Sequence, residues 1–319
     1  MKLFKNLIQF CGAAALVAGA AGASAAQLST DARGAIPRDV QQLVVIDYRA
    51  MQNSTAAMDL KARVMPPELK QFDEALSKSG LNDNHDVDQL AFALFRPSPG
   101  SDALQMVGIA QGQFSTQDVL ANFQKQKLKA TKVRQNSIYP MTKTGMVLCF
   151  VDPSTMVFGS KDAVTKALDA RDGMAQSMLT NGPMMNAMQS VDSNSLWSIL
   201  DNQGTQTMMK QILGEAGSVT DFDTVKARLE SSWYGMDFTH GVRFDLTIQT
   251  GDSFAAATVS SLLTAAVMLR KMTASDTEKQ ALSSTDIGSN SGNLNIHFAS
   301  SDSEFAALLQ SPLFQTMVH

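Results

Sequence analysis

Cysteine is nearly absent from this chain, and its scarcity excludes a disulfide-stabilised fold. The sequence has two cysteines, and Cys11 lies in an N-terminal segment that we expect to be removed. Cys149 then remains alone, so no intramolecular disulfide can form. Because it lies in an apolar, strand-like segment at 146–151, we expect a buried and inert thiol, with a reactive or intermolecular cysteine as the alternative. The fold must therefore depend on its hydrophobic core, for which 44% of apolar residues is sufficient.

The sequence also lacks the signatures of familiar enzymes and metal sites. None of its histidines is spaced as a metal-binding pair, and there is neither a His-Glu-x-x-His helix nor a Cys-x-x-Cys pair. Gly-Ser-Asn-Ser-Gly at 288–292 resembles a nucleophile elbow but has Asn at its centre, which favours a turn. The acidic cluster at 83–88 lacks the central Gly and final Glu of a calcium loop, which favours a solvated turn. We expect no catalytic residue, no metal and no cofactor.

An excess of positive charge is lacking as well. The chain has 26 basic and 30 acidic residues, for a net charge of −4. No basic stripe is interleaved with aromatic side chains, which is the usual sign of a nucleic-acid surface. A mildly acidic protein binds polyanions poorly, so nucleic acid is not an expected partner.

The N-terminus has the pattern of a secretory signal peptide. Lys2 and Lys5 form a short basic head, an apolar run follows at 12–22, and Ala-Ser-Ala at 23–25 is a small-x-small cleavage site. The run is too short to span a bilayer. We predict that residues 1–25 are a signal peptide and that the mature protein is exported, either periplasmic or secreted.

Hydrophobic periodicity predicts an α+β fold with two tandem units. Strands are expected in the first unit at 42–48, 90–95, 104–110, 145–151 and 155–159, and in the second at 195–201, 231–238, 242–249 and 293–299. Helices are expected at 51–79 (with a break at 66–67), 115–125, 160–169, 205–215, 252–271 and 300–310. Each unit is then βαββαβ-like, the split β-α-β arrangement, in which helices pack on an antiparallel sheet.

Corresponding elements recur at an offset of about 138 residues, which predicts an internal duplication. The third strand, the helix after it and the last strand keep this spacing. The segment at 157–162, Val-Phe-Gly-Ser-Lys-Asp, also resembles that at 297–302, His-Phe-Ala-Ser-Ser-Asp. The alternative is a chance match between two α+β halves. We place the first unit at 36–172 and the second at 173–319.

Three short motifs give the chain a resemblance to a known group of proteins. They are Pro-Arg-Asp-Val at 37–40, Asp-Val-Asp-Gln-Leu-Ala-Phe-Ala at 86–93 and Gly-Gln-Phe at 112–114. The pattern resembles a family of exported bacterial proteins that have a duplicated α+β unit and an unknown function. The resemblance implies that fold and export, and it implies no activity and no site residues.

Methionine is abundant, with 19 residues, and five of them are candidate ligand-binding residues. Met184, Met185 and Met188 lie near the expected junction of the units, and Met208 and Met209 lie on the next expected helix. A cuprous site is disfavoured because no His or Cys accompanies them. Thioether side chains fill irregular gaps in cores and line adaptable binding grooves, so plain core is the competing interpretation.

The sequence favours an exported, non-catalytic protein that binds an unknown protein partner or a small apolar ligand between its two units. The alternative is an enzyme of unrecognised, hydrolase-like type with its active site in the cleft between the units. The apolar stretch at 254–269 predicts a core helix, with membrane-surface contact as the alternative. It is shorter than a bilayer-spanning helix, so no transmembrane segment is expected after signal cleavage.

Overall fold

The computed structural model describes residues 27–81, 83–98, 101, 103–213, 222–312 and 314. By its internal contacts the chain forms two compact units. Of the described residues, the N-terminal unit takes in those at 27–52 and 65–186, and the C-terminal unit takes in those at 53–64 and from 187 onward. The predicted signal peptide at 1–25 lies outside the described residues.

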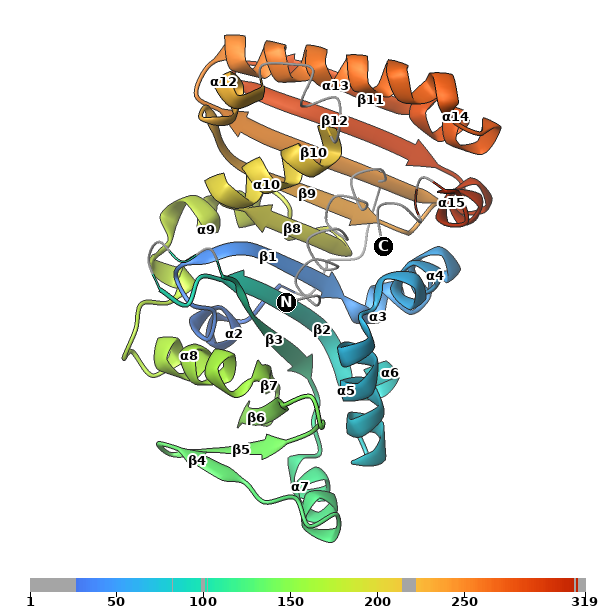
Figure 1. Cartoon of the computed structure of the whole chain (residues 1–319). Coiled ribbons are helices and arrows are strands. Elements are labelled where there is room, and N and C mark those ends of the chain that lie inside the picture. The colour runs from blue at the N-terminus through green and yellow to red at the C-terminus, as the bar shows by residue number, and fades with distance from the viewer. Residues whose placement is uncertain are drawn as a thin grey trace. The chain divides into compact units, whose positions relative to one another are not determined.

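The N-terminal unit is an antiparallel sheet with helices, in the strand order β1-β2-β3-β7-β6-β5-β4 (Figure 1). Its strands are β1 (Val40–Asp47), β2 (Val87–Phe95), β3 (Gln105–Gly112), β4 (Thr131–Val133), β5 (Asn136–Pro140), β6 (Met146–Asp152) and β7 (Thr155–Ser160). Its helices are α2 (Thr30–Gly34), α3 (Tyr48–Met51), α5 (Pro67–Lys78), α6 (Asp83–Asp86), α7 (Thr116–Lys125) and α8 (Lys161–Arg171), followed by the short 3-10 helix η1 (Met178–Thr180). Helix α9 (Gly182–Gln189) carries the chain into the C-terminal unit.

The C-terminal unit is also antiparallel, in the order β8-β9-β10-β12-β11. Its strands are β8 (Leu196–Leu200), β9 (Leu229–Asp237), β10 (Val242–Thr250), β11 (Thr285–Asn290) and β12 (Asn293–Ser300). Its helices are α4 (Thr55–Val64), α10 (Asn202–Leu213), α12 (Phe222–Lys226), α13 (Ser253–Thr273), α14 (Asp276–Ser283) and α15 (Asp302–Leu309). The expected α+β class, with antiparallel sheets and helices, is confirmed.

Five strands follow the same order in both units, since β1-β2-β3-β7-β6 matches β8-β9-β10-β12-β11. In chain order, a helix follows the third strand of each unit (α7 after β3, α13 after β10), and another follows the last strand (α8 after β7, α15 after β12). Strand β11 was not expected, so the second unit has one more strand than the pattern predicts. The duplication also requires superposable backbones, and it stays a prediction.

Side-chain caps explain where several helices begin. The Ser160 hydroxyl accepts a hydrogen bond from the Ala163 amide at 3.2 Å at the start of α8. Ser301 and Glu304 form a capping box at the start of α15. These caps satisfy backbone amides that have no partner inside the helix. Both helix starts were expected from the sequence.

The strands of the two units differ in how their faces are covered. Seven of the eight residues of β1 are buried, including Leu43, Val44 and Val45 from both faces of the strand. Strand β10 alternates instead, with Phe244 and Leu246 buried and Asp245 exposed. One face of the β10–β12 region is therefore solvated, as an alternating pattern predicts.

Candidate functional site

Helix α13 is the most unusual surface element of the C-terminal unit. Its N-cap Asp252 accepts a hydrogen bond from the Ala255 amide at 2.7 Å. Its inner face buries Ala255, Ala256, Val259 and Leu263, and the helix packs on β11 and β12 (Figure 1). Helix α13 thus packs on the sheet through a narrow apolar stripe.

The outer face of α13 exposes large apolar side chains. Phe254 is 70% exposed, Met268 63%, Leu269 60% and Met272 80%. Ala257, Ser261 and Ala265 lie exposed between them. No charged residue occurs from 253 to 269, so the helix has an apolar or small residue on every side. An uncharged helix that exposes several large apolar side chains marks an interaction surface more often than a core element.

Charge is confined to the two ends of α13. Asp252 pairs with Arg228 at 2.6 Å at the N-terminus. The hydrogen bond from the Ala255 amide lowers the pKa of Asp252, desolvation by burial opposes this effect, and Arg228 adds to the lowering. At the C-terminus Arg270 is exposed and Lys271 is half-buried, where cations offset the helix dipole. The C-terminal end of α13 therefore carries positive charge.

Among the described residues α13 is the one helix long and apolar enough to cross a membrane, judged by length and composition. It has 21 residues, and 22% of its most apolar stretch is buried. The helices of soluble cores pass the same test, but they are mostly buried. The bounds of α13 lie within two residues of the helix expected at 252–271, but the helix is less buried than the core helix that the sequence favoured.

The five candidate methionines occupy two elements. Helix α9 carries Met184 and Met188, which are buried, and Met185, which is partly exposed. Helix α10 carries Met208 and Met209, both buried. Met184 and Met185 belong to the N-terminal unit, and the other three belong to the C-terminal unit. Burial is compatible with a core and with a closed groove, so their role in ligand binding stays a prediction.

Two further sequence candidates lie in the N-terminal unit. Cys149 is buried, and burial raises the pKa of its thiol against an opposing effect of Arg171. In the segment at 83–88, Asp83–Asp86 is helical and the carboxylate of Asp88 pairs with Arg49. In the parts of the chain that the structure describes, no three His, Cys, Asp or Glu residues form a metal-binding group.

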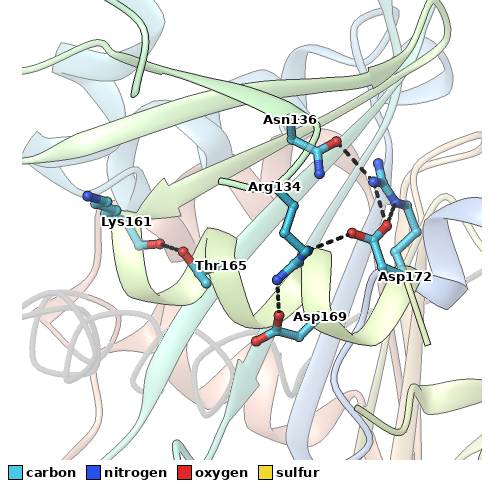
Figure 2. Close-up of polar contacts among 7 residues, drawn as sticks. Arg134, Asn136, Lys161, Thr165, Asp169 and Asp172 are labelled. Atoms are coloured by element: carbon cyan, nitrogen blue, oxygen red, sulfur yellow. Dashed lines mark hydrogen bonds and ion pairs between the residues drawn. The ribbon is translucent and has the colours of Figure 1, made fainter. Parts of the chain in front are cut away.

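A polar cluster that the sequence analysis did not identify joins the β4–β5 hairpin to α8 (Figure 2). Arg134 donates to Asp169 at 2.6 Å and to Asp172 at 3.1 Å. Arg171 donates to Asp172 at 2.6 Å and to Asn136 at 3.0 Å. Partial burial raises the pKa of Asp172, but the two arginines outweigh it and the pKa is lowered. Nothing in the spacing of 134 and 172 signals this contact.

The cluster stabilises a turn that its sequence disfavours. Arg134 has a φ of 54° in the turn between β4 and β5, a left-handed conformation that costs an L-residue about 1–2 kcal/mol. Its guanidinium pairs with Asp169 through Nη1 and with Asp172 through Nε, and the hydrogen bond to Asp169 is the main cause of its raised pKa. Along α8, Thr165 donates its hydroxyl to the Lys161 carbonyl at 2.8 Å. The cluster thus holds the hairpin in place and has no reactive group to spare.

Comparison with known proteins identifies the fold. No family model matches the chain, and no curated protein matches it. Two crystal forms of TP0453, a Treponema protein, are similar in structure, with TM-scores of 0.51 and 0.50. Each is 12% identical, covers 88% of this chain and is itself covered over 97% and 98% of its length. At this identity the likeness shows the fold alone.

Proposed function

We propose that the chain is an exported, non-catalytic protein that binds an apolar ligand of the lipid class through the outer face of α13. The observation that carries the proposal is the set of four large apolar side chains, each at least 60% exposed, on one helix with an uncharged body. Exposing such a face to water is unfavourable by about 25 cal/mol per Å². A ligand that covers it recovers that free energy.

Lipid fits this face better than a small molecule does. The exposed residues extend from Phe254 to Met272, which is about 27 Å of helix at 1.5 Å per residue. A small apolar ligand needs a concave pocket. A long convex apolar stripe on a helix suits a lipid surface instead, because the helix can lie in the interface with its apolar face buried. Arg270 and Lys271, in the last turn of α13, complement the anionic head groups of a bilayer.

Export and a non-catalytic role have their own support. Lys2, Lys5, the apolar run and Ala-Ser-Ala at 23–25 favour secretion, and the resemblance to exported bacterial proteins agrees with it. The lowered pKa values of Asp252 and Glu304 are explained by helix caps, and that of Asp172 by ion pairs. Perturbed groups at an active site need a chemical task, and these three already have a structural one.

Vesicle sedimentation tests the proposal. The chain without residues 1–25 is mixed with phosphatidylcholine vesicles containing a quarter phosphatidylglycerol. We expect binding by the wild type and at least a tenfold loss of partitioning in Phe254→Gln/Met268→Gln/Met272→Gln. Replacing Arg270 and Lys271 by Gln is expected to weaken binding only when phosphatidylglycerol is present.

A matched control uses apolar residues that are exposed elsewhere. Met174 is 72% exposed and Leu179 41%, and both lie in the N-terminal unit. Met174→Gln/Leu179→Gln is expected to bind vesicles as the wild type does. If the wild type does not bind the vesicles, the proposal is overturned. It is also overturned if the wild type forms dimers which the α13 variant abolishes, because the partner is then a second copy.

A further inference from the structure

A second candidate site lies in the N-terminal unit, away from α13. An open pocket of about 420 Å³ is formed where α5 ends, where α7 ends and where the chain turns from β5 to β6. This volume is in the range of small-molecule sites, about 300–1,000 Å³. All of its lining residues belong to the N-terminal unit, so the pocket is complete within it.

The pocket has cationic side chains and no acidic ones. Lys78 from the end of α5 and Lys143 from the β5–β6 turn both line it, together with neutral residues. Neither ammonium group has an ion pair or hydrogen bond with the residues that the structure describes. Two unpaired cations that share a lining repel each other, and an anion between them removes the repulsion.

The segment that forms the α7 side and the β5–β6 side of the pocket is basic. The segment at 119–151 contains six basic residues and no acidic residue, although the chain as a whole has a net charge of −4. Lys125 and Lys127 flank the lining residue Gln126, and Lys129 follows the lining residue Leu128. Such a field concentrates anions near the pocket. Arg134 contributes little to it because Asp169 and Asp172 neutralise its charge (Figure 2).

Two helices end at the pocket, and their carbonyl groups would repel an anion if they were bare. They are capped instead. Gln126 donates its side-chain amide to the Lys78 carbonyl at 3.1 Å, and Asn122 donates to the Ser79 carbonyl at 3.1 Å. At the end of α7 the Leu128 amide donates to the Phe123 carbonyl at 2.9 Å. The lysines are therefore not needed to cap these carbonyls.

We infer that this pocket binds an organic phosphate monoester, with Lys78 and Lys143 contacting the phosphate. A phosphate monoester carries a charge of about −1.5 to −2 at neutral pH, which matches two ammonium groups. Lysine suits phosphate as a point charge with three donors. Ala75, Leu128 and Met141 also line the pocket and offer apolar contacts for the organic part of the ligand.

Calorimetric titration with sn-glycerol 3-phosphate at low ionic strength tests the inference. We expect saturable binding by the wild type and at least a tenfold weaker affinity in Lys78→Gln/Lys143→Gln. The matched control, Lys129→Gln/Lys132→Gln, removes the same charge from the same surface without touching the lining. It is expected to weaken binding by less than threefold. Lys78→Arg/Lys143→Arg keeps the charge and is expected to retain measurable binding.

The possible outcomes separate the sources of the phosphate. Dihexanoyl phosphatidic acid is a soluble lipid with the same head group, and tighter binding of it than of glycerol phosphate assigns the site to lipids. Equal or weaker binding assigns the site to water-soluble esters. If the lining variant and the control variant lose equal affinity for the ligand, the inference is overturned, because the protein then attracts the anion by diffuse surface charge. Absence of binding by the folded wild type at 10 mM ligand also overturns it.

Discussion

Gly80 and Asn122 together close the C-terminus of α5. Gly80 has a φ of +88°, and a Cβ placed on it would lie 2.9 Å from the Asn122 side-chain nitrogen. That nitrogen donates to the Ser79 carbonyl at 3.1 Å. The left-handed residue and the capping amide therefore lie against each other, so a side chain at position 80 would displace the Asn122 amide.

Gly80→Ala is expected to destabilise the protein by more than the backbone strain alone, which is about 1–2 kcal/mol. Gly145→Ala is the control, because Gly145 has a φ of +90° but nothing lies within 4 Å of its added Cβ. Urea unfolding of both variants isolates the cost of the contact with Asn122. Equal losses would show that Asn122 moves aside freely.

A pair of leucines on α13 tests which face of the helix supports the fold. Leu263 is 2% exposed and Leu269 60% exposed. Leu263→Ala is expected to cost about 2–5 kcal/mol, whereas Leu269→Ala is expected to change the free energy of unfolding by less than about 0.5 kcal/mol. Chemical denaturation measures both. Similar losses at the two positions would mean that the outer face is covered by protein.

Alanine variants of the α9 methionines distinguish a core from a ligand-binding groove. Met188 is 4% exposed, so Met188→Ala is expected to cost about 2–5 kcal/mol if it is plain core. Met185 is partly exposed, and Met185→Ala should cost less. If both variants keep the wild-type melting temperature and lose a ligand that co-purifies from the native host, the groove interpretation holds. Unfolding of both variants, with no ligand found, would rule the groove out.

Asp172 gives a pH dependence with a defined sign. Its pKa is lowered in the folded state, so its stabilising contribution is present above the unfolded pKa of about 3.9 and is lost as pH falls through the folded pKa. The stability difference between wild type and Asp172→Asn should be constant above about pH 5 and shrink below about pH 4. Its size should not exceed about 1 kcal/mol, because the pair is partly exposed. A stability difference between the two proteins that persists at pH 2, or that is unchanged in 1 M salt, would contradict this account.

The Cys149 thiol is expected not to react until the protein unfolds. Burial raises the pKa of the thiol, and the thiolate is the reactive form. Ellman's reagent should therefore react at the rate of unfolding in native buffer and at once in urea. A fast reaction of the native protein would reassign Cys149 as a reactive cysteine.

Strongly periodic segments were predictable from the sequence, and polar segments were not. Strand β1 and helix α7 lie within a few residues of the expected ranges because buried apolar residues set their period. Strand β11 is Thr-Asp-Ile-Gly-Ser-Asn with four exposed residues, and so it has no apolar pattern to detect. The β4–β5 hairpin was missed for the same reason, since both β4 and its turn are polar and exposed.

The candidate sites were harder to predict than the fold. The apolar composition of α13 was visible, but which residues face solvent depends on the sheet beneath it. Lys78 and Lys143 are far apart in the sequence and come together only through the ends of α5 and β5. The contact of Arg134 with Asp169 likewise arises from tertiary structure.

The pairing of α4 with α15 has a consequence for how the chain is made. Helix α4 precedes most of the N-terminal unit in sequence, yet it belongs to the C-terminal unit and packs against α15. A ribosome releases α4 well before α15. Domains usually fold in order of emergence, but the contact between α4, whose Ala56, Ala57 and Leu60 are buried, and α15 can form only after the intervening N-terminal unit has emerged. A chain truncated before Asp302 would therefore leave α4 without α15 to pack against.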